Sequence, residues 1–110
     1  MFARTVTIRL KPDTVAEFNR MLEKDILPIL RNQKGFREEI ALVAPNGSEV
    51  IGISLWDKRE SAEAYQRTAY SEVQKFLAKV STATPQVQTY DVSVTTLQQK
   101  AATTGRGLSG

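Results

Sequence analysis

The chain has 110 residues, of which 41% are hydrophobic and 25% charged, and its formal net charge is +3. These values are typical of one globular domain. The sequence contains neither cysteine nor histidine, which excludes disulfides, thiolate chemistry, Cys-based zinc sites and the commonest protein ligand of haem iron. We therefore expect neither a metal site nor a cofactor.

No apolar run reaches the length of a membrane span, and the first ten residues lack the apolar core of a signal peptide. We expect a cytoplasmic protein that does not bind membranes. The net charge falls from +3 to +1 once Lys100 and Arg106 near the C-terminus are set aside. That balance is too small to indicate a nucleic-acid partner.

The first predicted strand runs from Phe2 to Leu10, where apolar and polar residues alternate. A helix capped by Asp13 or Thr14 should follow, with an apolar stripe ending near Ile29. Pro28 lies inside that pattern, so it should kink the helix or leave residues 29–32 as an irregular last turn.

Three further segments complete the strands. Gly35 should end the first helix, and Phe36 to Ala44 forms a second strand. Asn46-Gly47 predicts a tight turn, since these residues tolerate positive φ, so Val50 to Trp56 should pair antiparallel with that strand. A fourth strand is expected over residues 86–97.

A second helix should start behind Trp56, where Asp57 and Glu60 have the spacing of a cap and a third-position carboxylate. It should pause at Tyr70 and restart at Ser71. Residues 1–97 then form the domain, and 98–110 form a flexible tail, because their Gln, Ala, Thr, Gly and Ser side chains bury little apolar surface.

This β-α-β-β-α-β order predicts an α+β, ferredoxin-like fold with a four-stranded antiparallel sheet. We expect the helices to cover the more apolar face of the sheet, which would hold Val6, Ile8, Leu10, Ile40, Leu42, Ile51, Ile53 and Leu55. The opposite face would then hold Ala3, Thr5, Thr7, Arg9, Glu39, Ala41, Val43, Val50, Gly52, Ser54 and Trp56. That face carries too little charge for a solvated surface, so a homodimer is expected.

Val50, Gly52 and Ser54 are small residues that lead along one side of a strand to Trp56, the single tryptophan. We expect a cavity beside them. Trp56 by itself is more simply explained as a core residue, but the small neighbours favour a role in lining a pocket.

The strand ending in ISLW, the following DKRESAEAY and the earlier ILPILRNQKGF resemble antibiotic-biosynthesis-monooxygenase-type domains. The resemblance covers residues 1–97 and implies a dimeric α+β barrel, with Trp56 pointing into a cavity between sheet and helices. The family includes cofactor-independent oxygenases of quinols and aromatic polyketides, and haem-degrading enzymes.

Two departures from that family follow from the sequence. Tyr65 occupies the place where many members carry a histidine, and the first strand lacks the asparagine of oxygenase members, offering Thr5 or Thr7 instead. Without a histidine, we do not expect haem degradation of the usual kind, which needs an axial histidine. Cofactor-independent oxygenation needs a dry pocket, a proton acceptor and a group that stabilises an anion.

The candidate catalytic residues are Tyr65 as hydrogen-bond donor, Glu39 as proton acceptor, and Arg9 or Arg37 as the group that favours the anion. The candidate substrate pocket for a small phenolic, quinol or polyketide-like ligand comprises Trp56, Ser54, Gly52, Thr5, Thr7 and Arg37. Structural explanations stand beside these: Tyr65 as an ordinary amphipathic helix residue, and Arg9 with Glu39 as a cross-strand ion pair at a dimer contact.

Two alternatives to an enzyme remain. The same order of elements occurs in RNA-binding modules, but the middle strands here lack the aromatic residues on which bases stack. The other alternative is a non-catalytic domain of the same fold that binds a small ligand or serves homo-oligomeric assembly. Fold alone does not separate it from a monooxygenase.

Overall fold

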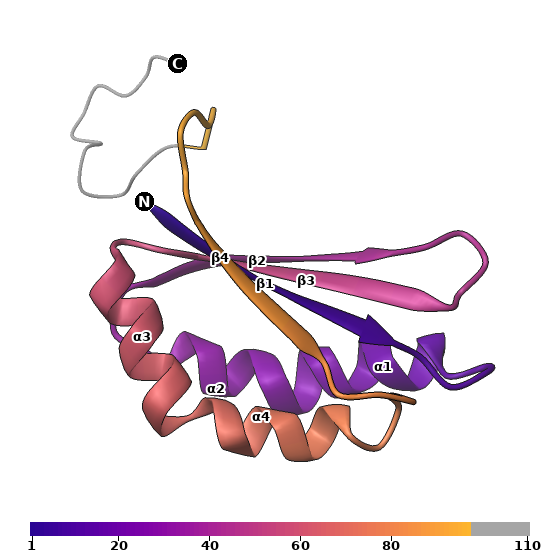
Figure 1. The fold of residues 1–110 in the computed structure, drawn as a ribbon. Coiled ribbons are helices and arrows are strands. Elements are labelled where there is room, and N and C mark those ends of the chain that lie inside the picture. Colours follow the sequence, from indigo (N-terminus) through magenta and orange to yellow (C-terminus); the bar gives the residue numbers. More distant parts are fainter. Residues whose placement is uncertain (98–110) are drawn as a thin grey trace.

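The computed structural model describes residues 1–97 (Figure 1), so the predicted tail over 98–110 lies outside the described residues. Its elements are β1 (Phe2–Arg9), α1 (Val15–Met21), a π-helical turn η1 (Leu22–Ile26), α2 (Leu27–Arg31), β2 (Phe36–Val43), β3 (Glu49–Trp56), α3 (Arg59–Thr68), α4 (Tyr70–Leu77) and β4 (Gln86–Asp91). This order confirms the predicted ferredoxin-like α+β fold.

The four strands form one antiparallel sheet in the order β2-β3-β1-β4. All helices lie against one face of it, and the other face has no helix among the described residues (Figure 1). β4 ends at Asp91, six residues before the predicted end at Leu97, because Asp91 already pairs with Phe2 at the start of β1. The chain beyond Asp91 therefore runs past its partner strand.

The first helix is interrupted before Pro28. The N–H of Leu27 donates to the carbonyl of Leu22, five residues back, and the chain then returns to α-helix. Pro28 has no N–H to offer the carbonyl of Lys24, and a π-helical turn redistributes the bonds around such a gap. The predicted disturbance is confirmed, but it precedes Pro28, and residues 27–31 are regular α-helix.

The second helix breaks at Ala69, one residue before the predicted pause, and neither α3 nor α4 has a side-chain cap hydrogen bond. Lys58, not Asp57, is the N-cap of α3. Gly35, with φ of +86°, accepts a hydrogen bond at its carbonyl oxygen from the N–H of Asp57 at 2.9 Å and packs under the start of α3. The tight fit there explains why a residue without a side chain is needed.

The predicted assignment of the sheet faces is wrong for β2 and β3. Ile8 pairs with Val50 and Val6 with Gly52, and directly paired residues share a face. Val50 and Trp56 therefore lie on the helix face, where both are fully buried. Ile40 and Leu42 lie on the open face, exposed by 42% and 49%. The resemblance indicated the correct face for Trp56, although Trp56 does not line the cavity on that face, whereas the rule that the more apolar set faces the helices gave the wrong face.

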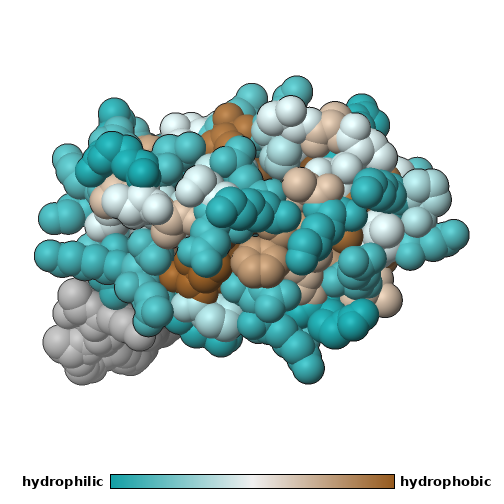
Figure 2. Space-filling model, turned by 90° about the horizontal axis from the view of Figure 1, so that it is seen from below, coloured by the Kyte–Doolittle hydropathy of each residue, from teal (hydrophilic) through white to brown (hydrophobic). Residues whose placement is uncertain are grey.

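The helix side of the molecule has a largely hydrophilic surface, with a few apolar side chains between charged ones (Figure 2). The open sheet face differs: it exposes Ile40, Leu42 and Tyr90, with Ile51 and Ile53 partly buried beside them. No helix among residues 1–97 is long and apolar enough to cross a membrane.

Candidate functional site

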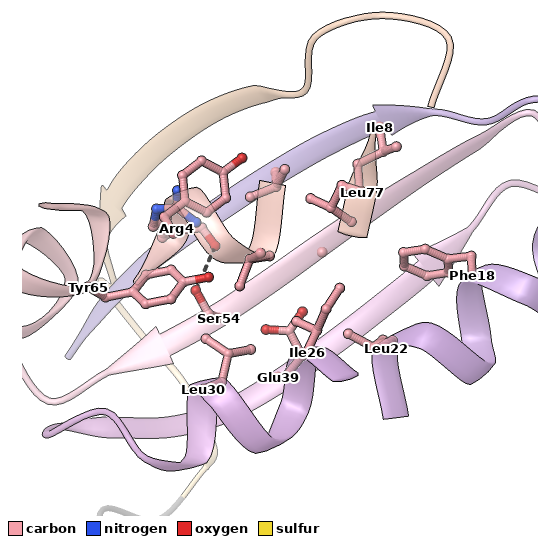
Figure 3. A pocket seen from close by; sticks show the side chains of 14 residues that line it. Arg4, Ile8, Phe18, Leu22, Ile26, Leu30, Glu39, Ser54, Tyr65 and Leu77 are labelled. Atoms are coloured by element: carbon pink, nitrogen blue, oxygen red, sulfur yellow. Dashed lines mark hydrogen bonds between the residues drawn. The ribbon is translucent and has the colours of Figure 1, made fainter. Parts of the chain in front are cut away.

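A cavity of about 40 Å³, here called the inner cavity, lies between the sheet and the helices (Figure 3). Apolar side chains from α1, η1, α2 and α4 form most of its wall, and Phe18 and Leu77 lie at one end. Polar side chains gather toward the other end, where the lining residues are Arg4, Glu39, Ser54, Tyr65 and Tyr70. A mostly apolar pocket with a few converging polar groups is the usual form of a small-molecule site.

Arg4 is the central polar residue of the inner cavity. It lies on the helix face of β1 and is only 3% exposed. Its guanidinium carbon is 4.1 Å from the ring centroid of Tyr70 and 5.1 Å from that of Tyr65. Its Nη2 and Nε donate to Gln66 Oε1 at 2.6 and 3.2 Å. Two aromatic faces and a neutral amide thus hold this buried cation in place.

Glu39 projects into the cavity from β2, opposite Arg4 (Figure 3). Burial raises the pKa of its carboxyl from 4.5 to about 8, and the nearby positive charge of Arg4 only partly offsets that rise. Gly52 makes room for it, since a Cβ at that position would lie 3.2 Å from Glu39 Oε2. Such a carboxyl is mostly protonated at neutral pH and takes up or releases a proton near pH 8.

Tyr65 reaches the cavity from α3. Burial raises the pKa of its phenol, the positive charge of Arg4 partly offsets that rise, and Tyr70 and Glu39 add smaller increases. The hydroxyl therefore stays protonated and is suited to donate a hydrogen bond. Its ring packs on Trp56 with 5.2 Å between centroids. Trp56 Nε1 donates to Ser54 Oγ at 2.9 Å, and Ser54 Oγ donates to the carbonyl of Arg4 at 3.3 Å. Trp56 thus supports the cavity wall from behind.

Tyr70 begins α4, directly after the break at Ala69, and covers Arg4. Its hydroxyl is buried and has no hydrogen-bond partner among residues 1–97. Buried polar groups nearly always have partners, so an unpartnered hydroxyl in a cavity wall indicates a position at which a ligand or a water can bind.

The structure brings together four of the residues proposed from the sequence: Glu39, Tyr65, Ser54 and Gly52 line the inner cavity, and Trp56 packs beside it. The other four lie elsewhere. Thr5, Thr7 and Arg9 are on the open face, each paired with β3, and Arg37 occupies the irregularity of β2 between Phe36 and Glu38. Arg9 pairs with Glu49, so the proposed cross-strand pair with Glu39 is wrong.

Arg4 was missed because the sequence argument selected only the apolar members of its strand face. The sequence nevertheless contained an indication of its role. In the alternating pattern of residues 2–10, Arg4 is the one charged residue on the same side as Val6 and Ile8. A charged side chain on an otherwise buried strand face must find partners or a function. No group of three His, Cys, Asp or Glu side chains within residues 1–97 is arranged to hold a metal ion.

Solved structures share this fold at low sequence identity. A monooxygenase from the gene ActVA-Orf6 of Streptomyces coelicolor, in complex with nanaomycin D, aligns with a TM-score of 0.73 at 14% identity, over 89% of this chain and 92% of that one. SnoaB, a cofactor-independent oxygenase from Streptomyces nogalater, aligns with a TM-score of 0.71 at 13% identity, over 88% and 97%.

A protein of unknown function from Nitrosomonas europaea, NE2512, aligns as well, with a TM-score of 0.71 at 15% identity over 89% of this chain and 94% of that one. At these identities the alignments establish the common fold. No curated protein matches the sequence. The family model for antibiotic biosynthesis monooxygenases, however, matches residues 1–88, which is most of the chain. The chain belongs to the antibiotic biosynthesis monooxygenase family.

Proposed function

We propose that this protein is a cofactor-independent monooxygenase of a small phenolic, quinol or polyketide-like substrate. The observation that carries the proposal is the pairing of a carboxyl and a guanidinium across one buried, mostly apolar cavity: Glu39, with its pKa raised to about 8, and Arg4, which is desolvated. These are the proton acceptor and the anion-stabilising group that the reaction needs. A structural relative that is a cofactor-independent oxygenase supports it.

In the proposed reaction, the Glu39 carboxylate removes a proton from the substrate, and Arg4 stabilises the resulting electron-rich anion. Dioxygen then adds to the activated ring carbon and forms a peroxide anion. The peroxide takes the proton back, and its O–O bond breaks as the hydrogen still on that carbon leaves as a proton, which joins the departing hydroxide as water. One oxygen atom becomes a carbonyl and the other becomes water, so the substrate supplies all four electrons and no cofactor is consumed.

Tyr65 and Tyr70 have supporting roles. Both phenols are buried at the Arg4 end of the cavity, and the Tyr70 hydroxyl has no partner within residues 1–97. A protonated phenol donates a hydrogen bond to a developing oxyanion, and its ring excludes water from the charged group. The apolar wall formed by Phe18 and η1 excludes water from the rest of the inner cavity, which protects the carbanion from protonation by solvent.

The volume of the inner cavity sets a condition on this function. About 40 Å³ accommodates water-sized molecules, whereas pockets for drug-sized ligands measure about 300 Å³ or more. The substrate must therefore displace part of the wall when it enters. The same small volume favours the second candidate function, a non-catalytic domain that serves ligand binding or assembly.

We also propose that the chain forms a homodimer through its open sheet face. Ile40 and Leu42 of β2 are exposed there, beside the partly buried Ile51 and Ile53 of β3, and within residues 1–97 the helices lie on the other face of the sheet. An antiparallel sheet with an uncovered apolar face is normally covered by another layer. A second copy supplies such a layer.

The test is oxygen uptake with a quinol and an anthrone, with the product identified by mass. The proposal expects one O2 consumed per substrate. Glu39→Gln should lower the rate by about 10²–10⁴-fold, as for loss of a general base. Glu38→Gln is the matched control, because Glu38 is the next residue of β2 and is exposed on the open face. Absence of uptake with both substrates would favour the non-catalytic candidate.

A further inference from the structure

A second cavity, here called the outer cavity, lies between α3 and the strands β1 and β4 and has a volume of about 220 Å³. α3 contributes Arg59, Glu63 and Gln66 to its wall, and the strands contribute Phe2, Arg4 and Tyr90. Arg59 lies with its guanidinium carbon 5.5 Å from the ring centroid of Phe2. The outer cavity therefore combines the Phe2 ring with charged and amide groups.

Arg4 alone among residues 1–97 lines both cavities. Its guanidinium hydrogen-bonds to Gln66, which belongs to the outer wall, and its other contacts are the rings of Tyr65 and Tyr70, which belong to the inner wall. The Arg4 side chain with Gln66 thus forms the partition between the two spaces. Joining them requires displacement of the Arg4 side chain.

We propose that the inner and outer cavities are two halves of one substrate site, and that Arg4 binds a carboxylate carried by an aromatic substrate. The proposal rests on the monooxygenase function for the inner cavity and adds the class of substrate: a phenol or quinol with a carboxylate on the ring. The ring carbon that reacts occupies the inner half, and the rest of the molecule occupies the outer half.

The charge on Arg4 favours an anionic ligand. Its hydrogen-bond acceptor within residues 1–97 is a neutral amide. The groups that face it from the packed elements are Glu39 on β2, Tyr65 on α3 and Tyr70 on α4. Burial raises the pKa of Glu39 to about 8 and also raises that of Tyr65, so both side chains favour the neutral form at pH 7. Glu63 and Asp91 in the outer cavity are exposed, so water screens them. Within residues 1–97, the acceptor of the buried guanidinium is thus the Gln66 amide, and no carboxylate bonds to it.

Geometry and size agree with this ligand. Only Nε and Nη2 of Arg4 bond to Gln66, and a guanidinium has further N–H donors in the same plane, suited to a carboxylate that accepts two bonds. The inner cavity is too small for an aromatic ring, but joined to the outer cavity it approaches the roughly 300 Å³ typical of small-molecule sites.

The test compares two ligands by calorimetry at neutral pH: 1-hydroxy-2-naphthoate and 1-naphthol, which differ by the carboxylate alone. The wild-type protein should bind the naphthoate at least about tenfold more tightly. Arg4→Gln should abolish that preference. Gln66→Glu should abolish it too, because an added carboxylate next to Arg4 competes with that of the ligand. Gln66 is exposed, so this variant keeps the fold.

Gln74→Glu is the matched control, because it adds the same charge at an exposed position of α4 and should preserve the preference. Equal affinity for the two ligands, a preference that survives both Arg4→Gln and Gln66→Glu, or no binding of either ligand would overturn the inference. Oxygen uptake is measured separately. Selective binding without uptake refutes the monooxygenase function only, and uptake without carboxylate preference refutes this inference only.

Discussion

The buried carboxyl of Glu39 should make the stability of the protein depend on pH, and Glu39→Gln should remove that dependence. The pKa of this group is raised from 4.5 to about 8 in the folded protein. The folded state therefore holds a proton that the unfolded chain releases. Raising the pH between those two values favours the unfolded state, so this contribution opposes folding increasingly up to about pH 8 and then levels off.

The magnitude follows from the shift. Each pH unit within the window lowers the free energy of unfolding by about 1.4 kcal/mol. Between pH 5 and pH 8 the loss from Glu39 amounts to about 3–4 kcal/mol, after allowing for partial titration at both ends. Since the free energy of unfolding of a typical domain is about 5–15 kcal/mol, this is a large fraction. Glu39→Gln should be more stable than the wild-type protein at pH 8, and the difference in stability should be much smaller at pH 5.

The assay is urea denaturation at four pH values from 5 to 8, at one protein concentration, followed by the fluorescence of Trp56, which is the single tryptophan. Glu38→Gln removes a neighbouring exposed carboxyl and should keep the wild-type slope against pH. If the wild-type protein and Glu39→Gln lose stability in parallel across this range, Glu39 is not buried in the protonated form and the reasoning about the cavity is refuted.

Three further changes have defined outcomes. Gly35→Ala should lower the free energy of unfolding by more than about 2 kcal/mol by thermal denaturation, because its φ is +86° and a Cβ would overlap the Asp57 carboxylate. Trp56→Phe should cost about 1–3 kcal/mol, measured by circular dichroism, since Ser54 Oγ loses its buried donor. Leu42→Lys should convert the proposed dimer to a monomer in light scattering, because it places a charge on the open face.

Each of these changes has a comparison that isolates its cause. Gly47→Ala also places an alanine at positive φ, but the nearest atom is a Val15 methyl at 3.4 Å, so it should cost less than Gly35→Ala. A Trp56→Phe protein as stable as the wild type would contradict a supporting role for the indole N–H. The control for Leu42→Lys is Lys75→Glu. Lys75 is exposed on α4, on the helix side, so this change should leave the oligomeric state unchanged. A monomeric wild-type protein would refute the dimer.

The order of elements was predictable because each rests on local signals. Alternation over residues 2–10, the Asn46-Gly47 turn and the apolar spacing of the helices involve neighbours in the chain, and the structure confirms them. Glu39, Tyr65 and the small residues before Trp56 were also identifiable as candidates, since a carboxyl within a strand and small residues beside a large aromatic are visible in one sequence. The sequence did not predict that these residues lie together around one cavity.

The sequence by itself determined the ferredoxin-like order, the absence of histidine and cysteine chemistry, and the likeness to the family that the comparisons establish. Only the tertiary structure decided which face of β2 and β3 meets the helices. Strand pairing fixes that choice, since joining Val6 to Gly52 and Ser54 to Glu39 puts a whole alternating set on one side. That register places Arg4 and Glu39 on the same face, each paired with Ser54, and no local pattern encodes the proximity of residues so far apart in the chain.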